Sequence, residues 1–510
     1  MDAAHQKAAL SHSVADGIFG TAWTSLTGGA FLVGFALKIF HADSRVIGAL
    51  AALPLLANVV QVAGSLLIER TGRKKPVSIA GVMAGRLAWV AVILLPFLAA
   101  PGTALASWPL IAAMGVSSLF AAVGSVGWTA WMGDLVPAKQ RGAFFGRRNM
   151  IASVAGTAAL LLGGRALDAA ARAGIPDRSA FAGLFSAGLL CGMVSVWFLF
   201  RLPETGAPPA PREKPADLSL IFRPLRDTNF RTLILSVCAW SVAVQVAGPF
   251  YSVFLIDVLR ADFGTITFFG TCATIATLLM MRTWGPISDR YGNRPVIVVS
   301  SWILVLVPLL WIVARPGSYF LPVLLANVVS GAAMAGAALS QFNILIKLSP
   351  RQGRSMYVAI FAAITGLVGA AAPIAGGLAV RALHGMGFTV LSLHITGLHV
   401  LFLASSVIQV LSILPALRIR EPAAAAPMAV LMQLKNDLNP QTGIASSADL
   451  VMVEVRRGRR VVDKVDRETQ RLARASERRV SAIADRIGTA TAGVRARVRR
   501  YLRDTHDDGK

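Results

Sequence analysis

The sequence is poor in charged residues and in cysteine. Only 15% of its 510 residues are charged, whereas soluble domains carry about 25%, which argues against a string of soluble domains. The three cysteines, Cys191, Cys238 and Cys272, lie in apolar runs and form no C-x-x-C pair, which argues against disulfides and zinc sites. Hydrophobic residues make up 55% of the chain. Lipid is therefore the expected solvent for most of it.

Catalytic motifs are also missing. The sequence contains no G-x-S-x-G, no H-E-x-x-H and no Walker motif, and these patterns place the nucleophile, the zinc ligands or the phosphate cradle in many enzymes. The chain is therefore expected to be neither an enzyme nor an ATP-driven pump. No catalytic residue, metal or cofactor is predicted.

Long apolar runs are what the sequence does contain. A hydrocarbon core of about 30 Å needs a helix of about 20 apolar residues, and twelve runs reach that length. These runs are residues 18–40, 46–68, 76–101, 108–135, 144–167, 181–202, 230–255, 265–287, 295–314, 319–348, 357–383 and 390–417. The expected fold class is an all-α polytopic membrane protein with twelve transmembrane helices.

The formal net charge of +24 indicates how these helices are oriented. With the N-terminus placed in the cytoplasm, the cytoplasmic connections and their flanks hold 20 Lys and Arg, and the outer connections hold eight. Short cytoplasmic loops are enriched in Lys and Arg. The asymmetry predicts that both termini are cytoplasmic, in a multi-pass protein of the cell (inner) membrane.

The chain divides into two similar halves joined by a polar, proline-rich linker. The predicted divisions are an N-terminal half at 1–202, a cytoplasmic linker at 203–229, a C-terminal half at 230–417 and a tail at 418–510. Four short patterns recur between the halves in the same order, at offsets of 213 to 220 residues. Two parallel six-helix repeats with a binding site between them form a transporter architecture.

One recurring pattern carries a family resemblance. The first copy, after the second span, contains Ser65, Glu69, Arg70, Gly72 and Arg73, and the second copy, after the eighth span, contains Gly285, Asp289, Arg290, Gly292 and Arg294. Both resemble the G-x-x-x-D-R-x-G-R-R/K signature of the major facilitator superfamily of secondary transporters. Residues 369–377 also resemble the glycine-proline motif of that family. The resemblance covers about residues 15–420.

The resemblance implies a cytoplasmic latch that favours the outward-facing state. An acid can accept hydrogen bonds from a helix N-terminus, and a glycine permits a tight turn. We expect Asp289 to face the start of the fifth span, Glu69 to face the start of the eleventh, and Asp134 to pair with Arg70. Ser65 and Glu69 depart from the family pattern and indicate a looser latch in the N-terminal half. The alternative is that these residues only fix topology.

In this family the first span of each three-helix unit lines the central cavity, which yields the substrate-site candidates. The polar and aromatic candidates are Trp23, Thr24, Thr27, Trp128, Trp131, Gln245, Tyr251, Asn327, Gln341 and Asn343. Such a lining suits an amphipathic or weakly polar organic molecule. Each residue also has an ordinary interpretation, since aromatic residues gather at membrane interfaces and a lone amide bonds to a neighbouring helix.

Ionisable residues inside spans are costly and suggest function. Arg86 is the deepest charge and could hold an anionic substrate, pair within its own half, or snorkel to the interface. No Asp or Glu is predicted deep in the first or fourth span, because Asp16 and Asp257 lie near span ends. Proton coupling therefore stays open beside facilitated diffusion.

The tail, residues 418–510, differs from the rest of the chain in composition: it is polar and basic, with 20 Lys and Arg against 12 Asp and Glu. Hydrophobic residues recur between 455 and 498 at close to 3.5-residue spacing, which is typical of an amphipathic basic helix or a weak coiled coil. The interpretations are a helix bound to anionic lipid, a partner helix, or a solvated tail. Nucleic acid is not expected, because no recognition motif accompanies the charge.

These observations predict a secondary transporter that moves a small organic solute by alternating access, with efflux as the expected direction. The alternative is a membrane scaffold or sensor on the same fold, acting through the basic tail. A cavity that holds a polar cluster of Gln245, Asn327 and Asn343 would favour transport, and a collapsed apolar interior would favour the scaffold.

Overall fold

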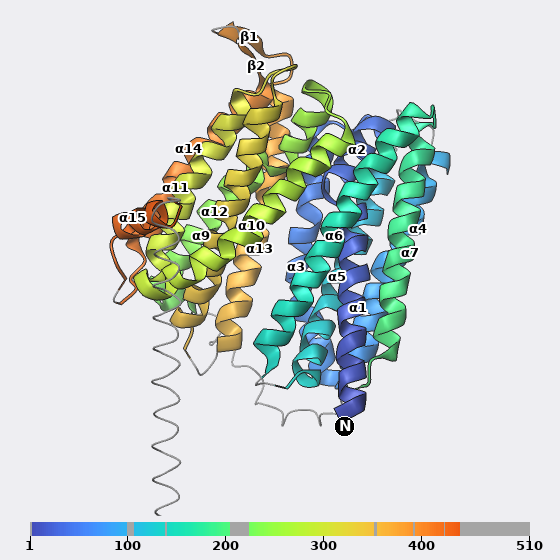
Figure 1. Ribbon diagram of the computed structural model, residues 1–510, viewed down its shortest axis with the longest axis vertical. Coiled ribbons are helices and arrows are strands. Elements are labelled where there is room, and N and C mark those ends of the chain that lie inside the picture. Colours follow the sequence, from blue (N-terminus) through green and yellow to red (C-terminus); the bar gives the residue numbers. More distant parts are fainter. Residues whose placement is uncertain are drawn as a thin grey trace, which may run out of the picture. The chain divides into compact units, whose positions relative to one another are not determined.

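A computed structural model describes residues 3–98, 107–137, 140–204, 224–350, 354–390, 393–422 and 424–438 (Figure 1). Within these residues, twelve helical segments are long and apolar enough to cross a membrane. The expected all-α polytopic fold is thereby confirmed. Most of the predicted linker (205–223) and the tail beyond residue 438, with its expected amphipathic helix, lie outside the described residues.

The elements follow one another along the chain as helices, with one short hairpin. The N-terminal half contains α1 (Ala3–Thr27), α2 (Gly29–Phe40), α3 (Ser44–Thr71), α4 (Lys74–Leu98), α5 (Ser107–Leu135), α6 (Arg141–Arg172) and α7 (Asp177–Arg201). The C-terminal half contains α9 (Thr228–Val253), the π-helix η3 (Phe254–Val258), α10 (Phe263–Tyr291), α11 (Asn293–Ile312), α12 (Phe320–Leu348), α13 (Arg354–Ala382), β1 (Gly387–Val390), β2 (Leu393–Thr396) and α14 (Gly397–Arg418). A short helix, α15 (Pro427–Leu438), follows.

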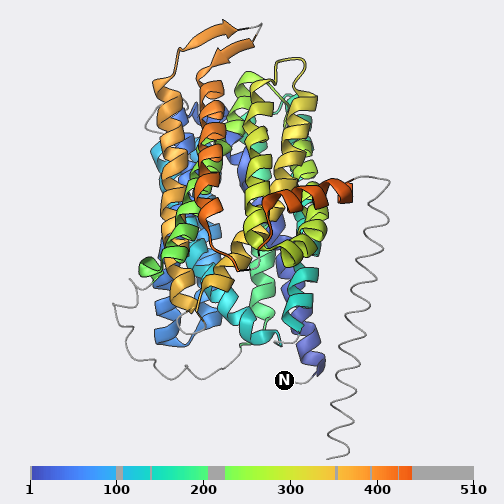
Figure 2. The same ribbon diagram turned by 90° about the vertical axis from the view of Figure 1, so that its left-hand side faces the viewer.

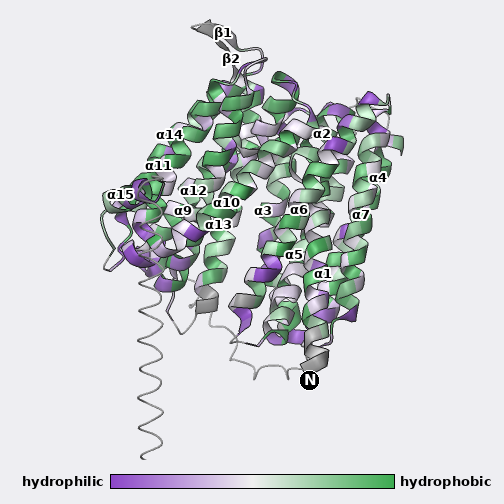
Figure 3. Cartoon of the chain, in the orientation of Figure 1, coloured by the Kyte–Doolittle hydropathy of each residue, from purple (hydrophilic) through white to green (hydrophobic). Residues whose placement is uncertain are grey.

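Hydrophobic residues cover most of each helix, and hydrophilic residues gather toward the helix ends (Figure 3). This pattern is what a lipid solvent requires, because only fully hydrogen-bonded backbone is stable in hydrocarbon. Several starts are fixed by side-chain caps. Asp43 accepts hydrogen bonds from the backbone N–H groups of Arg45 and Val46, and Asp262 accepts one from that of Thr265. Both carboxylates satisfy N–H groups that a helix start leaves unpaired.

The first and last spans differ from their sequence-based limits. The first span runs over Ala8–Phe40, ten residues earlier than expected, and it is broken between Thr27 and Gly29, where Gly29 has a φ of +55°. The polar residues before position 18 are helical because they pack against α6 and α7. The last span begins only at Gly397, since residues 387–390 and 393–396 pair as antiparallel strands that extend beyond the helix ends (Figure 2).

Helix packing repeats between the two halves. In the N-terminal half the packed pairs are α1/α6, α1/α7, α3/α5, α4/α5 and α4/α7. The corresponding pairs in the C-terminal half are α9/α13, α9/α14, α10/α12, α11/α12 and α11/α14. Two further pairs, α3/α13 and α6/α10, join the halves and are themselves equivalent under this correspondence. The duplicated sequence therefore folds into two units related by a pseudo-two-fold arrangement.

The halves are joined at one end of the bundle, the hairpin end, defined by the connections at 41–43, 173–176 and 259–262 and by the β-hairpin. On one seam, Arg381 of α13 pairs with Asp43 at 3.1 Å, and the hydroxyl of Ser44 donates to the carbonyl of Gly377 at 2.9 Å. On the other seam, Asp168 of α6 accepts hydrogen bonds from the backbone N–H groups of Phe263 and Gly264 at 2.9 and 2.7 Å. Both seams join the start of one helix to the end of another.

Aromatic packing reinforces this end. Phe263 of α10 contacts Phe31 and Phe181 of the N-terminal half, with ring centroids 6.1 and 5.6 Å apart. Phe31, Phe35, Phe181 and Phe263 belong to one large buried core that includes residues of both halves. Close backbone approach completes the seam, because Gly48 of α3 lies directly against the backbone of Pro373 on α13.

Replacing Gly48 tests whether close approach of α3 and α13 holds the hairpin end together. A Cβ at Gly48 would clash with the carbonyl oxygen of Pro373. Because this oxygen belongs to the backbone of α13, it cannot move without displacing the helix. Overpacking of this kind costs about 1–3 kcal/mol. Gly48→Ala should therefore lower the melting temperature of the purified protein in detergent, measured by intrinsic fluorescence. Gly133→Ala is the control, since its Cβ would meet nothing within 4 Å; equal melting temperatures for both variants would refute the close-approach argument.

Candidate functional site

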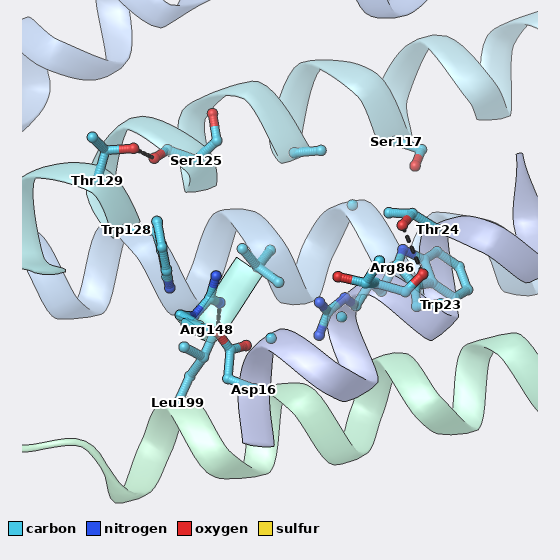
Figure 4. A pocket seen from close by; sticks show the side chains of 16 residues that line it. Asp16, Trp23, Thr24, Arg86, Ser117, Ser125, Trp128, Thr129, Arg148 and Leu199 are labelled. Carbon is cyan, nitrogen blue, oxygen red and sulfur yellow. Dashed lines mark hydrogen bonds and ion pairs between the residues drawn. The ribbon is translucent and has the colours of Figure 1, made fainter. Parts of the chain in front are cut away.

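A cavity of about 470 Å³ lies within the N-terminal half (Figure 4). Five helices form its walls: α1, α4, α5, α6 and α7. Its charged and aromatic lining residues are Asp16, Trp23, Arg86, Trp128 and Arg148. The volume falls within the range of about 300–1,000 Å³ that small-molecule sites occupy.

Asp16 of α1 is the centre of a buried charge network in the cavity wall. Its Oδ2 pairs with Nη2 of Arg148 at 3.0 Å. Its Oδ1 accepts a hydrogen bond from the hydroxyl of Ser195 on α7 at 2.6 Å. The same hydroxyl accepts one from Nη2 of Arg86 at 3.1 Å. Four helices thus contribute to one chain of charged and polar groups.

The two arginines are held by backbone carbonyls as well. Arg86 donates from Nη1 to the carbonyl of Gly192, and Arg148 donates from Nε to the carbonyl of Ser13 at 2.9 Å. Glycines make room for both side chains: a Cβ at Gly192 would lie 3.1 Å from Cδ of Arg86, and one at Gly17 would lie 3.0 Å from Cζ of Arg148. The small residues of α1 and α7 therefore position the guanidinium groups.

Aromatic side chains line the rest of the cavity. Trp23 packs edge-to-face on Trp89 at 5.3 Å, and Nε1 of Trp89 donates to the hydroxyl of Ser117 at 3.1 Å. The guanidinium of Arg148 lies 4.5 Å from the ring centre of Trp128 (Figure 4), a favourable cation–π geometry. Nε1 of Trp128 is buried and has no hydrogen-bond partner among the residues that the structure describes. The cavity therefore combines flat apolar walls with a surplus of hydrogen-bond donors.

The structure brings together only part of the predicted substrate site. Trp23 and Arg86 line the cavity, as does Trp128, and Thr27 is buried one turn from Trp23 and donates to its carbonyl. The candidates of the C-terminal half, Gln245, Tyr251, Asn327, Gln341 and Asn343, do not line it. Two of these have clear structural contacts: Tyr251 stacks on Trp311 at 4.7 Å, and Asn327 donates to the carbonyl of Val323 in its own helix. Nε2 of Gln341 is buried and makes no hydrogen bond to any described residue.

Sequence reasoning missed three residues of the network. Asp16 is predicted near a span end, but the first span begins at Ala8, so Asp16 lies inside it and is 6% exposed. Arg148 lies in the predicted fifth span, at its cytoplasmic flank, and is not singled out as a site residue, yet it pairs with Asp16 of α1. Ser195, which joins Asp16 to Arg86, is not singled out either. The one sequence feature that points to this network is the presence of an acid, Asp16, and a base, Arg148, at the same membrane edge of two different spans.

The duplicated loops take the tight turns that their glycines predict. Gly72 ends α3 with a φ of +67°, and Gly292 joins α10 to α11 with a φ of +95°. Arg70, Asp289 and Arg290 are exposed at this end of the bundle, the motif end, which lies opposite the hairpin end. The side chain of Glu69 lies outside the described residues.

The expected pairing of Asp134 with Arg70 requires correction. Asp134, at the end of α5, forms its ion pair with Lys74 instead. Lys74 is the first residue of α4, which packs along α5, whereas Arg70 belongs to α3 and is exposed. The cation nearest to Asp134 is therefore on the helix that follows the loop.

Glu421, just after α14, is a buried acid that sequence reasoning did not single out. Its Oε2 accepts hydrogen bonds from the backbone N–H groups of Asn293 and Arg294 at 2.9 and 2.7 Å, at the start of α11. Its Oε1 pairs with Lys347 of α12 at 3.0 Å. Burial alone would raise the pKa of Glu421, but these donors outweigh it and hold the pKa below its ordinary value of 4.5. The carboxylate ties three helices of the C-terminal half together at the motif end.

Similarity to known proteins agrees with this fold. The sequence matches the Major Facilitator Superfamily over residues 17–259 and 233–434, and the chain belongs to that family. No curated protein sequence matches the chain. Family membership defines a secondary transporter rather than an enzyme, as the sequence predicted.

Solved structures with the same fold are transporters. A single-residue mutant of the nucleoside transporter NupG has 15% identity and a TM-score of 0.64, and the match covers 81% of this chain and 100% of that one. A bacterial homologue of the human lysosomal transporter Spinster, inward-facing and unoccupied, has 14% identity and a TM-score of 0.60, covering 86% of this chain and 100% of that chain. The E. coli xylose transporter XylE, inward-open, has 15% identity and a TM-score of 0.57, covering 81% and 96%.

Replacing Glu421 tests its role at the motif end. Hydrogen bonds to a charged group contribute about 1.5–3 kcal/mol, so Glu421→Gln should lower the melting temperature at pH 7. Because the folded-state pKa is depressed, this stabilisation is complete above pH 4.5 and is lost as the pH falls through the folded-state value. The difference between wild type and variant should therefore shrink in acid, measured by thermal unfolding across pH.

The control for Glu421 is Glu204→Gln. Glu204 follows α7 as Glu421 follows α14, but it is exposed. A melting temperature that falls equally in both variants, or a Glu421→Gln effect that does not change with pH, would contradict the assigned contacts.

Proposed function

We propose that the chain moves a small organic solute across the membrane by alternating access, with the N-terminal cavity as the main part of its binding site. The observation that carries this proposal is the cavity itself, a space of about 470 Å³ lined by buried charged and aromatic side chains in a helix bundle. A scaffold or sensor would have no use for a buried polar network of this kind, which is costly in a membrane. The cavity therefore favours transport over the scaffold.

The arrangement of the seams supports a state closed at the hairpin end. Two hydrogen-bonded seams and an aromatic core join the halves there, while Arg70, Asp289 and Arg290 are exposed at the motif end. We assign the motif end to the cytoplasm of the cell, with both chain termini on that side, in agreement with the Lys and Arg asymmetry. The structure then corresponds to an inward-facing state.

In this scheme the latch contacts of Asp289 and Glu69 form in the outward-facing state. Asp289 and Glu69 would reach the starts of α6 and α13 when the motif end closes and the hairpin end opens. A carboxylate facing a helix N-terminus is stabilised by the backbone N–H groups and the helix dipole. The exposure of Asp289 in the present state agrees with an open latch.

We propose efflux as the direction, with solute entering the cavity from the cytoplasm. Proton coupling, where it operates, is proposed to involve Asp16, the carboxylate in the cavity wall that pairs with Arg148. The basic tail is proposed to contact anionic lipid or a partner helix. The related folds carry nucleosides and xylose by their descriptions, so solutes of those kinds belong in any first panel.

Filling the cavity should block transport whatever the solute. Purified protein in proteoliposomes would be tested by counterflow with four solutes in turn: uridine, D-xylose, indole-3-acetate and tryptamine. Each vesicle preparation is preloaded with one unlabelled solute, and uptake of the same solute, labelled and added outside, is measured. Ser125 lines the cavity from α5, and Ser125→Trp should abolish the uptake that wild type shows. Leu190→Trp is the control, because Leu190 is 66% exposed on the outer face of α7. Folded wild-type protein that moves none of the four solutes, or uptake that survives Ser125→Trp, would contradict the proposal.

A further inference from the structure

We infer that the solute carries a negative charge, and that its anionic oxygens dock between Arg86 and Arg148 while an apolar ring lies against one of the two flanking indoles, Trp23 or Trp128. This inference rests on the proposed function and names its substrate class: small aromatic or amphipathic organic anions, carboxylates in the first instance. Charge balance, unused donors and the shape of the cavity wall support it independently of one another.

Charge balance is the first argument. The cavity is lined by two guanidinium groups and one carboxylate, and all three belong to membrane spans. Asp16 forms its ion pair with Arg148 and reaches Arg86 only through the hydroxyl of Ser195. One positive charge is therefore left over inside the bundle. Buried charges in a membrane are normally compensated, and an anionic solute would supply the missing partner.

Unused hydrogen-bond donors are the second argument. A guanidinium carries five N–H donors and no acceptor. Arg86 donates two hydrogen bonds to described residues, one to the carbonyl of Gly192 and one to Ser195. Nε1 of Trp128, in the wall of the same cavity, is buried and has no partner within the described part of the chain. The cavity thus offers donors in excess, and the complementary group is an acceptor such as a carboxylate.

The cavity wall is the third argument. Arg86 and Arg148 approach the cavity from α4 and α6, with Trp23 beside Arg86 and Trp128 beside Arg148 (Figure 4). An indole beside each guanidinium fits a molecule whose flat ring lies on one indole while its anion reaches the guanidinium groups. A cation would meet the surplus positive charge, and a neutral sugar would leave that charge uncompensated. Electrostatic selection of this kind sets specificity.

Three ligands that share one ring and differ in charge provide the test. Indole-3-acetate is an anion, indole-3-acetamide is neutral and tryptamine is a cation. Binding to the purified protein would be measured by thermal shift and by isothermal titration at pH 7. Indole-3-acetate should raise the melting temperature and bind, with affinity that falls as salt increases, whereas tryptamine should not bind and the amide should bind at least about tenfold more weakly.

Variants of the three charged residues separate recognition from structure. Arg86→Gln and Arg148→Gln should each weaken indole-3-acetate binding about tenfold or more, and Arg86→Lys should retain part of it. Asp16→Asn removes the internal counter-charge, so it should strengthen anion binding several-fold. A merely structural role for Asp16 would weaken binding of every ligand instead. Arg172→Gln, an exposed position on α6, is the control and should bind as wild type does.

Four results would overturn the inference. Equal or tighter binding of tryptamine or the amide would do so, as would no binding of any of the three ligands. Weaker anion binding in Asp16→Asn would also count against it. The fourth result concerns lipid. If phosphatidylglycerol in nanodiscs raises the melting temperature fully and indole-3-acetate then adds nothing, the two arginines bind a lipid headgroup rather than a solute. Counterflow of uridine, D-xylose or tryptamine in that same protein would show that transport stands although the anion assignment fails.

Discussion

Hydrocarbon offers no partner to a polar group, and that constraint shapes the whole molecule. It forces the backbone into helices whose hydrogen bonds close within each segment, and it makes every buried charge depend on a neighbour. The consequence is visible at three places. Asp16 lies between two arginines, Asp168 binds the backbone N–H groups at the start of α10, and Glu421 binds those at the start of α11. In each place an acid joins helices that apolar packing alone would leave free to slide.

The two halves share the same helix packing, but they differ in their charged and polar contacts. The same helix pairs meet in both halves, but their ion pairs differ. At the start of α4, Lys74 pairs with Asp134 near the end of α5. At the start of α11, the ion pair joins Lys347, near the end of α12, to Glu421, which follows α14. The cavity shows the same asymmetry, since its lining comes from the N-terminal half alone. The helix framework is therefore symmetric, whereas the charged and aromatic side chains around this cavity belong to one half.

Hydropathy was sufficient to predict twelve spans, because lipid selects for long apolar runs wherever they lie. It was insufficient for the site. The first helix reaches back through polar residues to Ala3, which no apolar window can detect, and Asp16 therefore lies inside a span. Tertiary packing on α6 and α7 decides that outcome. The partner of Asp134 could not be read from the sequence either, because Arg70 and Lys74 are close together along the chain and only the packing of α4 on α5 selects Lys74. The latch around Asp289 and Glu69 stays a prediction.

The break between α1 and α2 separates two tasks within the first span. Residues before it, including Asp16 and Trp23, line the cavity, and residues after it pack on α7 and, across the molecule, on α9. At the break Gly28 adopts extended backbone and Gly29 has positive φ, so two consecutive glycines interrupt the helix. Because neither glycine carries a Cβ, the backbone can turn sharply here. A single membrane crossing is thus built from two helices with different partners, the first in the wall of the cavity and the second in the contact between the two halves.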